Sequence, residues 1–175
     1  MKIIAIIQAR MSSSRLPKKV LLPILGKSVL EHIIFRVNLS KRINNIVVAT
    51  SDDKSDNLIV NLCTSLGVDY YRGSLNDVLD RFYKAALKFN ADAVLRITGD
   101  CPVIDYEIID KVILDFCNNN FDLYGLGGEF PDGLDCTIIK FSALKEAWEK
   151  SKLNSEREHV CPYIEKRPAD FKIGS

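Results

Sequence analysis

The sequence predicts one α/β domain built around a mostly parallel β-sheet. Short runs rich in β-branched residues alternate with longer segments of helical periodicity from residue 3 to about residue 118. Strand, helix and strand in succession form right-handed βαβ units, whose strands are parallel. With 175 residues, the chain is long enough to bury one core and too short for two comfortable domains.

The first unit comprises a strand at residues 3–7, a loop, and a helix at residues 28–39. The strand is an unbroken apolar run, which is typical of a strand buried on both faces. Ser28 and Glu31 have the spacing of a capping box, so they place the beginning of the helix.

Further units follow in the same rhythm. Gly67 is expected to end the second helix, and Ser74 with Asp77 to form a capping box that starts the third, with Arg81 on its polar side. The expected strands are residues 45–50, 68–71 and 93–97, and the expected helices are residues 55–66, 74–87 and 106–118.

The rhythm changes after residue 118. The expected elements are a half-exposed strand at 121–126, a glycine-rich loop at 127–133, a strand at 134–141, a helix from a Ser142 cap to Trp148, and a helical stretch at 155–164. Because this region breaks the βαβ pattern and carries an aromatic residue, Phe130, in a glycine-rich loop, we expect it to supply a homodimer interface.

Composition and charge limit the classes of protein to which this chain could belong. A net charge of +1 argues against a nucleic-acid binder that works by broad electrostatics. The sequence shows neither a membrane-spanning run nor a signal-peptide pattern, so a cytoplasmic protein is expected. Without a C-x-x-C pair, the five cysteines are expected to be reduced thiols, most of them in the core: Cys63, Cys101, Cys117, Cys136 and Cys161.

A basic loop follows the first strand. Six cations precede the first acidic residue, Glu31: Lys2, Arg10, Arg15, Lys18, Lys19 and Lys27. A loop at the carboxyl end of a parallel strand is where open α/β sheets bind ligands, and cations with serine hydroxyls suit a nucleoside triphosphate. The alternative is an ordinary solvated basic loop. Neither a kinase-type P-loop nor a G-x-G-x-x-G motif is present.

A second stretch that could take part in the chemistry follows the strand at residues 93–97. Asp100 comes at the carboxyl end of this strand, with Gly99 before it and Pro102 after it. A carboxylate beside a triphosphate suggests a magnesium ligand, because Mg²⁺ commonly takes one or two protein carboxylates plus phosphates and waters. The alternative is that Asp100 only begins a turn.

The chain resembles the sugar-acid cytidylyltransferases, which form CMP-3-deoxy-manno-octulosonate and CMP-neuraminic acid, and most closely the spore coat polysaccharide biosynthesis branch. Four segments carry the resemblance: residues 8–17, residues 77–82, residues 96–102 and residues 157–164. The resemblance implies a Rossmann-like, three-layer α/β/α nucleotide-diphosphosugar transferase fold, with residues 121–165 as a dimerisation and sugar-binding extension.

The resemblance also implies roles for individual residues. It assigns catalysis to Arg10, Lys19 and Asp100, with Asp100 binding Mg²⁺. Arg72 matches an arginine that reaches the cytosine. The implied nucleotide-binding residues are Ala9, Arg10, Ser12, Ser14, Arg15, Lys19, Arg72 and Thr98.

Two departures from the family pattern stand out. The family commonly has glycine at the position of Lys18. Its second metal-binding aspartate lies in a carboxyl-terminal segment absent from these 175 residues, so this form is expected to bind CTP with Mg²⁺ yet turn over slowly. Asp135 is the nearest substitute, and it could equally be structural.

The expected reaction is transfer of CMP from CTP to the anomeric hydroxyl of a keto-sugar acid, with release of pyrophosphate, for surface polysaccharide or glycan biosynthesis. One alternative is a nucleotidyltransferase for another sugar or nucleotide. The other is a nucleotide-binding subunit with little activity of its own.

Overall fold

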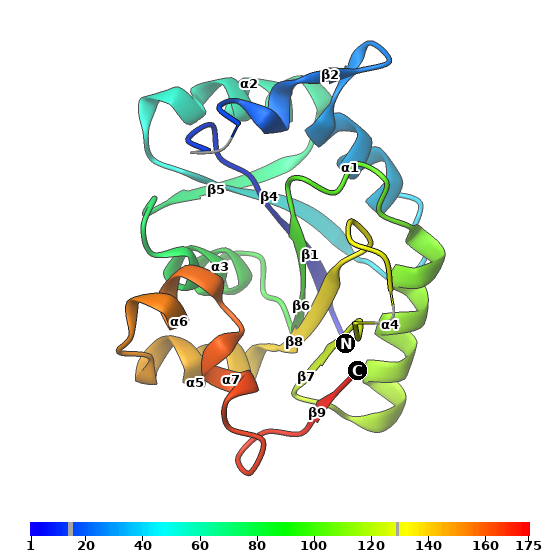
Figure 1. Ribbon diagram of the computed structural model, residues 1–175, viewed down its shortest axis with the longest axis vertical. Coiled ribbons are helices and arrows are strands. Elements are labelled where there is room, and N and C mark those ends of the chain that lie inside the picture. Colours follow the sequence, from blue (N-terminus) through cyan, green and yellow to red (C-terminus); the bar gives the residue numbers. More distant parts are fainter. Residues whose placement is uncertain (14–15, 129) are drawn as a thin grey trace.

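A seven-stranded sheet runs through the middle of the protein, in the order β5-β4-β1-β6-β8-β7-β9 (Figure 1). The computed structural model describes residues 1–13, 16–128 and 130–175. The strands are β1 (Ile3–Gln8), β4 (Asn45–Ser51), β5 (Asp69–Gly73), β6 (Ala93–Thr98), β7 (Leu123–Gly125), β8 (Cys136–Lys140) and β9 (Ile173–Gly174). Strands β1, β4, β5 and β6 are parallel, whereas β8 runs antiparallel to β6 and β7. The predicted α/β class with a mostly parallel sheet is therefore confirmed.

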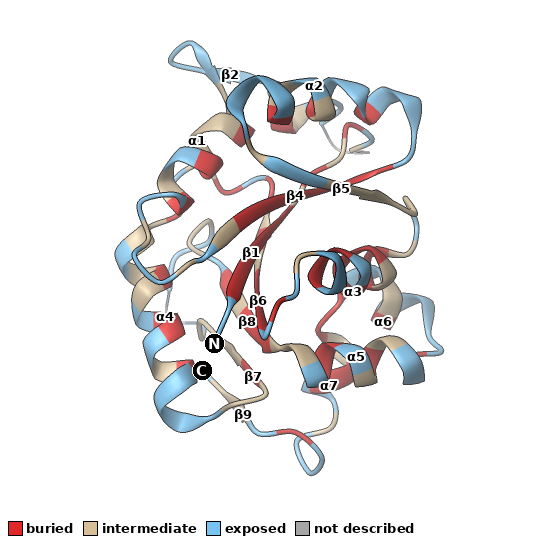
Figure 2. Ribbon diagram, turned by 180° about the vertical axis from the view of Figure 1, so that it is seen from behind, coloured by how far each residue is buried: buried red, intermediate tan, exposed pale blue. Residues whose placement is uncertain are grey.

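Helices cover both faces of the sheet, which gives three layers. One face packs against α1 (Val29–Val37), α2 (Asn57–Leu66) and α4 (Tyr106–Asn119). The other packs against α3 (Val78–Lys88), α5 (Phe141–Lys150), α6 (Asn154–His159) and α7 (Pro162–Glu165). Buried residues line the central strands and the inner sides of these helices (Figure 2). In the described ranges, no helix is long and apolar enough to cross a bilayer.

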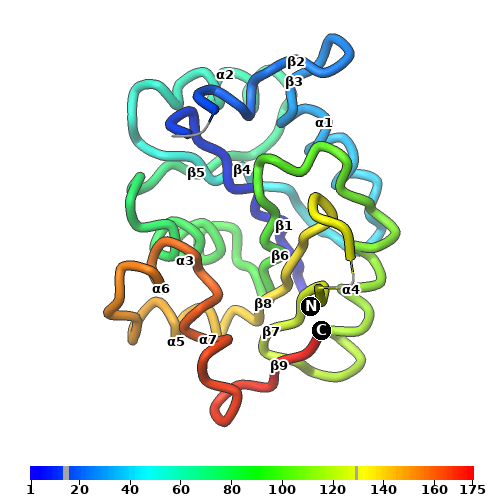
Figure 3. Tube along the Cα trace, in the orientation of Figure 1, coloured from blue at the N-terminus to red at the C-terminus, as the bar shows by residue number. Residues whose placement is uncertain are grey.

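Several short elements lie outside the predicted pattern. A hairpin of β2 (Pro23–Ile24) and β3 (Lys27–Ser28) projects from the body ahead of α1 (Figure 3). Single 3-10 turns are found at η1 (Lys19–Leu21) and η2 (Lys54–Asp56). With two or three residues each, these elements are too short to leave a periodic signal.

The predicted helix ends of the first two units are confirmed. The Ser28 hydroxyl accepts the Glu31 N–H at 3.2 Å, and the Glu31 carboxylate accepts the Ser28 N–H at 2.7 Å. Gly67 ends α2 in the left-handed region at φ +65°, where glycine pays no Cβ penalty.

Two predicted caps are wrong. Asp77, rather than Ser74, caps α3: its carboxylate accepts the Asp80 N–H at 2.9 Å, while Ser74 forms the preceding turn. Ser142 lies inside α5, which already begins at Phe141 with no side-chain cap. Because serine and aspartate also favour turns, their presence near a helix start does not fix its first residue.

The helix expected over residues 155–164 is two helices, with Val160 between them. Val160 is fully buried at φ +70° and ψ −55°, and the Cys161 N–H donates to the His159 carbonyl at 2.8 Å. These values define a classic γ-turn, a strained conformation that is unusual for a β-branched residue.

Arg81 was predicted on the polar side of its helix, and the structure contradicts this. It is fully buried, because this side of α3 faces the end of β5, where the Arg81 side chain packs against Gly73. Its Nη1 donates to the Ser74 carbonyl at 2.8 Å, and its Nε and Nη2 have no partner among the described residues. Burial, with the neighbouring charge of Arg10, lowers the pKa of this guanidinium to about 10.

Gly99 joins β6 to β1 at the end of the sheet. Its N–H donates to the Gln8 carbonyl at 2.8 Å, and a Cβ at this position would lie 2.6 Å from the same oxygen. The backbones can approach this closely only because residue 99 has no side chain.

We therefore expect Gly99→Ala to lower the free energy of unfolding by roughly 1–3 kcal/mol, as overpacking does in a closed core. Gly128→Ala is the control, because a Cβ there meets no described atom within 4 Å. Denaturant unfolding of both variants measures the difference. Equal losses would show that the contact with Gln8 relaxes at no cost.

The five cysteines are free, as predicted, and four of them are buried: Cys63, Cys101, Cys136 and Cys161. Burial raises the pKa of Cys63 and Cys161 to about 11 and that of Cys136 to about 12. Burial also raises the pKa of Cys101. Cys117 is exposed on α4.

A disulfide reagent such as DTNB should therefore titrate one thiol in the native protein at pH 8 and all five in denaturant, because the thiolate is the reactive form. Cys117→Ser should leave no fast-reacting thiol. Rapid reaction of a second thiol in that variant would mean that one of the buried sites opens locally.

Candidate active site

A polar cavity of about 210 Å³ lies at the carboxyl ends of β1 and β6. Its described lining residues are Gln8, Arg10, Ser13, Lys19, Val20, Arg96, Thr98, Gly99 and Asp100. The cavity thus brings together Arg10 and Lys19 from the basic loop with Thr98 and Asp100 from the end of β6. Two stretches separated by some eighty residues meet here because β1 and β6 are hydrogen-bonded neighbours.

Lys19 and Asp100 form the shortest charged contact in this cavity. The Lys19 Nζ lies 2.6 Å from Asp100 Oδ2, and both side chains remain partly exposed. Burial alone would raise the pKa of Asp100, but the hydrogen bond and charge of Lys19 and the Thr98 hydroxyl together outweigh it, so this pKa lies below its ordinary value. Asp100 is therefore an anion at neutral pH.

A buried carboxylate that was not predicted from the sequence fixes the start of the basic loop. Asp56 is 1% exposed and accepts the Met11 N–H at 2.7 Å. It also accepts the Ser51 N–H and the hydroxyls of Thr50 and Ser51. The only sequence signal was a cluster of three acids, Asp52, Asp53 and Asp56, in which no local feature marks the buried one.

The backbone at Lys18 explains the glycine that is common at this position in the family. Lys18 has φ +61° and ψ +14°, in the left-handed region that favours glycine. Its side chain is exposed, so the extra charge points away from the cavity lining.

Two other residues expected to bind nucleotide, Ala9 and Ser12, are not among the described residues that line the cavity. Ala9 is buried and donates its N–H to the Ala49 carbonyl at 3.1 Å, and Ser12 is exposed. Ser14 and Arg15 lie outside the described residues. Ser13, which was not predicted, lines the cavity in this loop.

Arg72 ties β5 to the segment that follows β4. Its guanidinium donates to the carbonyls of Ser51 and Asp53 and to the Asn57 side chain, at 2.9, 2.8 and 2.6 Å. It is not among the described residues that line the cavity. Its expected contact with a cytosine remains a prediction.

Within the described ranges, no group of three or more metal-binding side chains gathers in one place. Asp100 is the one carboxylate among the described residues of the cavity lining. The ammonium of Lys19 lies against this carboxylate, where a metal cation would bind. Asp135 accepts the Gly133 N–H at 3.2 Å within its own loop.

A second cavity, of about 460 Å³, adjoins the first through Arg10. Its other described lining residues are Leu75, Asn76, Asp77, Asn154, Arg157 and Glu158. Arg157 clamps the two sides: its Nε donates to Asp77 at 2.7 Å, and its Nη1 donates to the Trp148 carbonyl at 3.1 Å. The motif at residues 157–164 therefore meets the motif at residues 77–82 above the end of the sheet.

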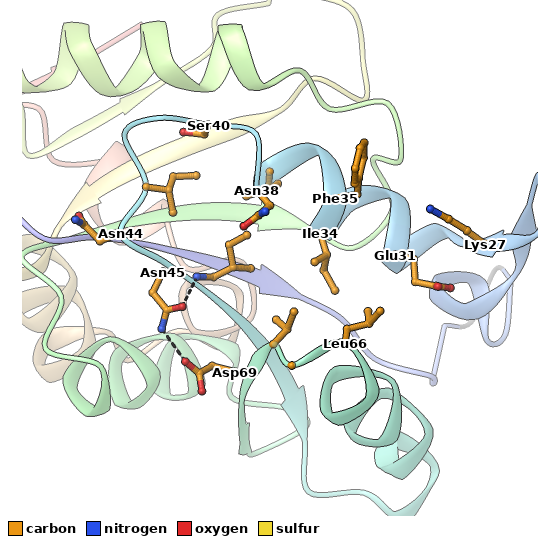
Figure 4. Close-up of a pocket in the computed structure, with 15 residues that line it drawn as sticks. Lys27, Glu31, Ile34, Phe35, Asn38, Ser40, Asn44, Asn45, Leu66 and Asp69 are labelled. Atoms are coloured by element: carbon orange, nitrogen blue, oxygen red, sulfur yellow. Dashed lines mark hydrogen bonds between the residues drawn. The ribbon is translucent and has the colours of Figure 1, made fainter.

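A third hollow, of about 450 Å³, lies between α1 and the turn that follows α2 (Figure 4). Several of its polar groups bond to one another: the Asn45 side chain donates to Asp69 at 2.8 Å and accepts the Ile46 N–H at 2.8 Å. Of the described basic-loop residues, Lys27 alone lines this hollow, and no described residue from the end of β6 does. The chemistry therefore points to the two cavities that share Arg10.

Comparison with known proteins shows the family and the fold. The profile of a family described as cytidylyltransferase matches residues 4–174. The uncharacterized protein MJ1063 of Methanocaldococcus jannaschii is 47% identical over 99% of this chain and 71% of its own length. The spore coat polysaccharide biosynthesis protein SpsF of Bacillus subtilis is 34% identical over 98% of this chain and 73% of its own length. A solved cytidylyltransferase from Leptospira borgpetersenii, 35% identical, superposes with a TM-score of 0.95 over 99% of this chain and 75% of its own.

The charges of the first cavity generate a test that uses nucleotides of different length. Arg10→Ala and Lys19→Ala should each weaken CTP binding by about 1.5–3 kcal/mol and CMP binding much less, because the loop is expected to contact the outer phosphates. Lys18→Gly is the matched control, since it removes an exposed cation from the same loop and suits the local backbone. Calorimetry that finds equal losses for CTP and CMP would contradict this placement of the phosphates.

Proposed function

Since the chain belongs to the cytidylyltransferase family, we propose that it transfers CMP from CTP to the anomeric hydroxyl of a keto-sugar acid and releases pyrophosphate. Its product would then serve surface polysaccharide or glycan biosynthesis, as the name of the Bacillus relative suggests. Membership of the cytidylyltransferase family supports the transfer of a nucleotidyl group. The sugar acid rests on the motif resemblance and on the positive character of the site.

One observation carries the proposal. Lys19 and Asp100, far apart in sequence, lie 2.6 Å apart in one cavity that also contains Arg10. A cation pair beside a carboxylate is the arrangement expected for a metal-bound triphosphate, whose oxygens need positive charge and whose metal needs an oxygen ligand.

The reaction is an in-line displacement at the α-phosphorus of CTP. The acceptor oxygen forms the new bond to phosphorus while the bond from phosphorus to the bridging oxygen of the β-phosphate breaks, and the acceptor proton passes to solvent. Arg10 and Lys19 neutralise the charge that develops on the departing pyrophosphate, and they hold it in line with the attacking oxygen.

The residues present fit a magnesium ion. Asp100 is ionised and faces the cavity, with Thr98 beside it, and Lys19 already places a cation against the same oxygen. When bound, Mg²⁺ would supply positive charge to the phosphate oxygens. Asp100 would hold the ion, and Lys19 would move from the carboxylate to the phosphates.

We place the acceptor in the second cavity, beside Arg10. Its polar lining of asparagine, aspartate, glutamate and arginine suits the hydroxyls of a sugar. The γ-turn at Val160 supports this placement, because backbone strain concentrates at functional sites and this turn directly follows the α6 residues that line the cavity.

We further propose a homodimer that pairs through residues 121–165. The part of this segment around the glycine-rich loop exposes Phe130, whereas its strands and helices belong to the core of the domain. Light scattering at high micromolar concentration tests the assembly, and a monomer under those conditions would contradict it.

The decisive experiment measures pyrophosphate release from CTP and Mg²⁺ with a panel of eight- and nine-carbon sugar acids. Asp100→Asn should lower the rate at least about a hundredfold and abolish the magnesium dependence of CTP binding. Asp135→Asn is the control and should retain both, because its carboxylate is engaged within its own loop. Pyrophosphate release by Asp100→Asn at the native rate would overturn the metal assignment.

A further inference from the structure

Two polar side chains form the floor of the first cavity on the face that α3 and α5 cover. Ile6 and Val94 pack on this face of the sheet, so by strand alternation Gln8 and Arg96 project to the same side. Both residues line the cavity. The reaction proposed above assigns neither of them a role.

Both side chains carry buried polar atoms without a partner. Among the described residues, Gln8 Oε1 and Arg96 Nε are shielded from solvent and form no hydrogen bond. No acidic side chain in the described ranges forms an ion pair with Arg96 or with Arg10. Because an unpaired buried polar group is costly, such groups in a cavity indicate that a ligand completes them.

The position of Arg96 relates it to the acceptor side of the site. The junction of α6 and α7, at Val160 and Cys161, packs in the core on this same face of the sheet, and the charge of Arg96 opposes the rise that burial causes in the pKa of the Cys161 thiol. The last residues of α6 line the acceptor cavity, and Val160 fixes the junction in its strained turn. Arg96 thus lines the first cavity on the face of the sheet where the junction of α6 and α7 packs.

We propose that Arg96, assisted by Gln8, binds the carboxylate of the acceptor; this inference rests on the proposed function. A planar guanidinium matches the two oxygens of a carboxylate. In a 2-keto sugar acid, the carboxyl group is attached to the anomeric carbon, next to the attacking hydroxyl. A residue that grips the carboxylate therefore orients the nucleophile and rejects neutral sugars.

The division of charge supports this assignment over a second triphosphate contact. Lys19 of the basic loop contacts Asp100, and Arg10 lines the same cavity, where the phosphates are expected. Arg96 lies two residues before Thr98, farther into the sheet. The Gln8 carboxamide can donate to the carboxylate and accept from a hydroxyl, which suits a hydroxy acid better than a phosphate.

The test is a calorimetric titration of the protein saturated with Mg²⁺ and α,β-methylene CTP, which cannot transfer CMP. The probes are 3-deoxy-manno-octulosonate, N-acetylneuraminate and their methyl esters. Arg96→Gln should weaken binding of an acid by about 10- to 100-fold, leave its ester unchanged, and leave the affinity for the CTP analogue within about twofold. Arg42→Gln, at an exposed site outside both cavities, is the matched control.

Three results would overturn the inference. Equal binding of an acid to the native protein and to Arg96→Gln would remove Arg96 from the acceptor site. Failure of both acids to bind the native complex would exclude a carboxylate ligand here, while binding of the CTP analogue would leave the nucleotide part of the function standing. Weaker binding of the CTP analogue to Arg96→Gln would place Arg96 among the phosphate ligands. Pyrophosphate release reports separately on the proposed function.

Discussion

The shape of the basic loop depends on one buried carboxylate, Asp56. It accepts the Met11 N–H directly after Arg10, and it also binds the end of β4 through Thr50 and Ser51. A buried charge is tolerable only when such hydrogen bonds surround it, and each of these donors would be left unpaired without it. The same carboxylate therefore joins β4, the first turn of the loop and the start of α2. Through this anchor, a flexible basic sequence becomes a fixed arrangement of cations at the carboxyl edge of the sheet.

The site built on this anchor carries more positive than negative charge. Lys19 is balanced by Asp100, whereas Arg10, Arg81 and Arg96 form no ion pair within the described ranges. Their mutual repulsion is visible in Arg81, whose pKa falls to about 10 through burial and the charge of Arg10. This excess of positive charge destabilises the free protein and favours the binding of a polyanion. The protein therefore loses part of its folding stability and gains affinity for such a ligand. An acidic side chain beside Arg96 would stabilise the free protein. It would also occupy the hydrogen-bond donors that Arg96 would otherwise offer to a ligand.

Much of this arrangement could be predicted from sequence, because it depends on local patterns. The periods of apolar residues gave the sheet and its helices, and the capping box at Ser28 gave a helix start. The meeting of Arg10 and Lys19 with Asp100 follows from parallel strands that end at one edge. Arg81 could not be predicted as buried, since its side of α3 is removed from solvent only when α3 packs against the end of β5 at Gly73. Asp56 was hidden for a similar reason: its role exists only when β4 and the loop after β1 come together.

The γ-turn at Val160 is a further feature that the sequence pattern did not predict. A helical pattern spans residues 155–164, and the chain breaks it at a β-branched residue, which local preference disfavours. The break lets α6 cross toward α3, where Arg157 reaches Asp77 at 2.7 Å, while α7 packs in the core on the same face of the sheet. Without the break, a straight helix could not supply both contacts. The strain is therefore the cost of placing Arg157 and Glu158 over the cavity, and the buried packing of Val160, Tyr163 and Ile164 offsets it.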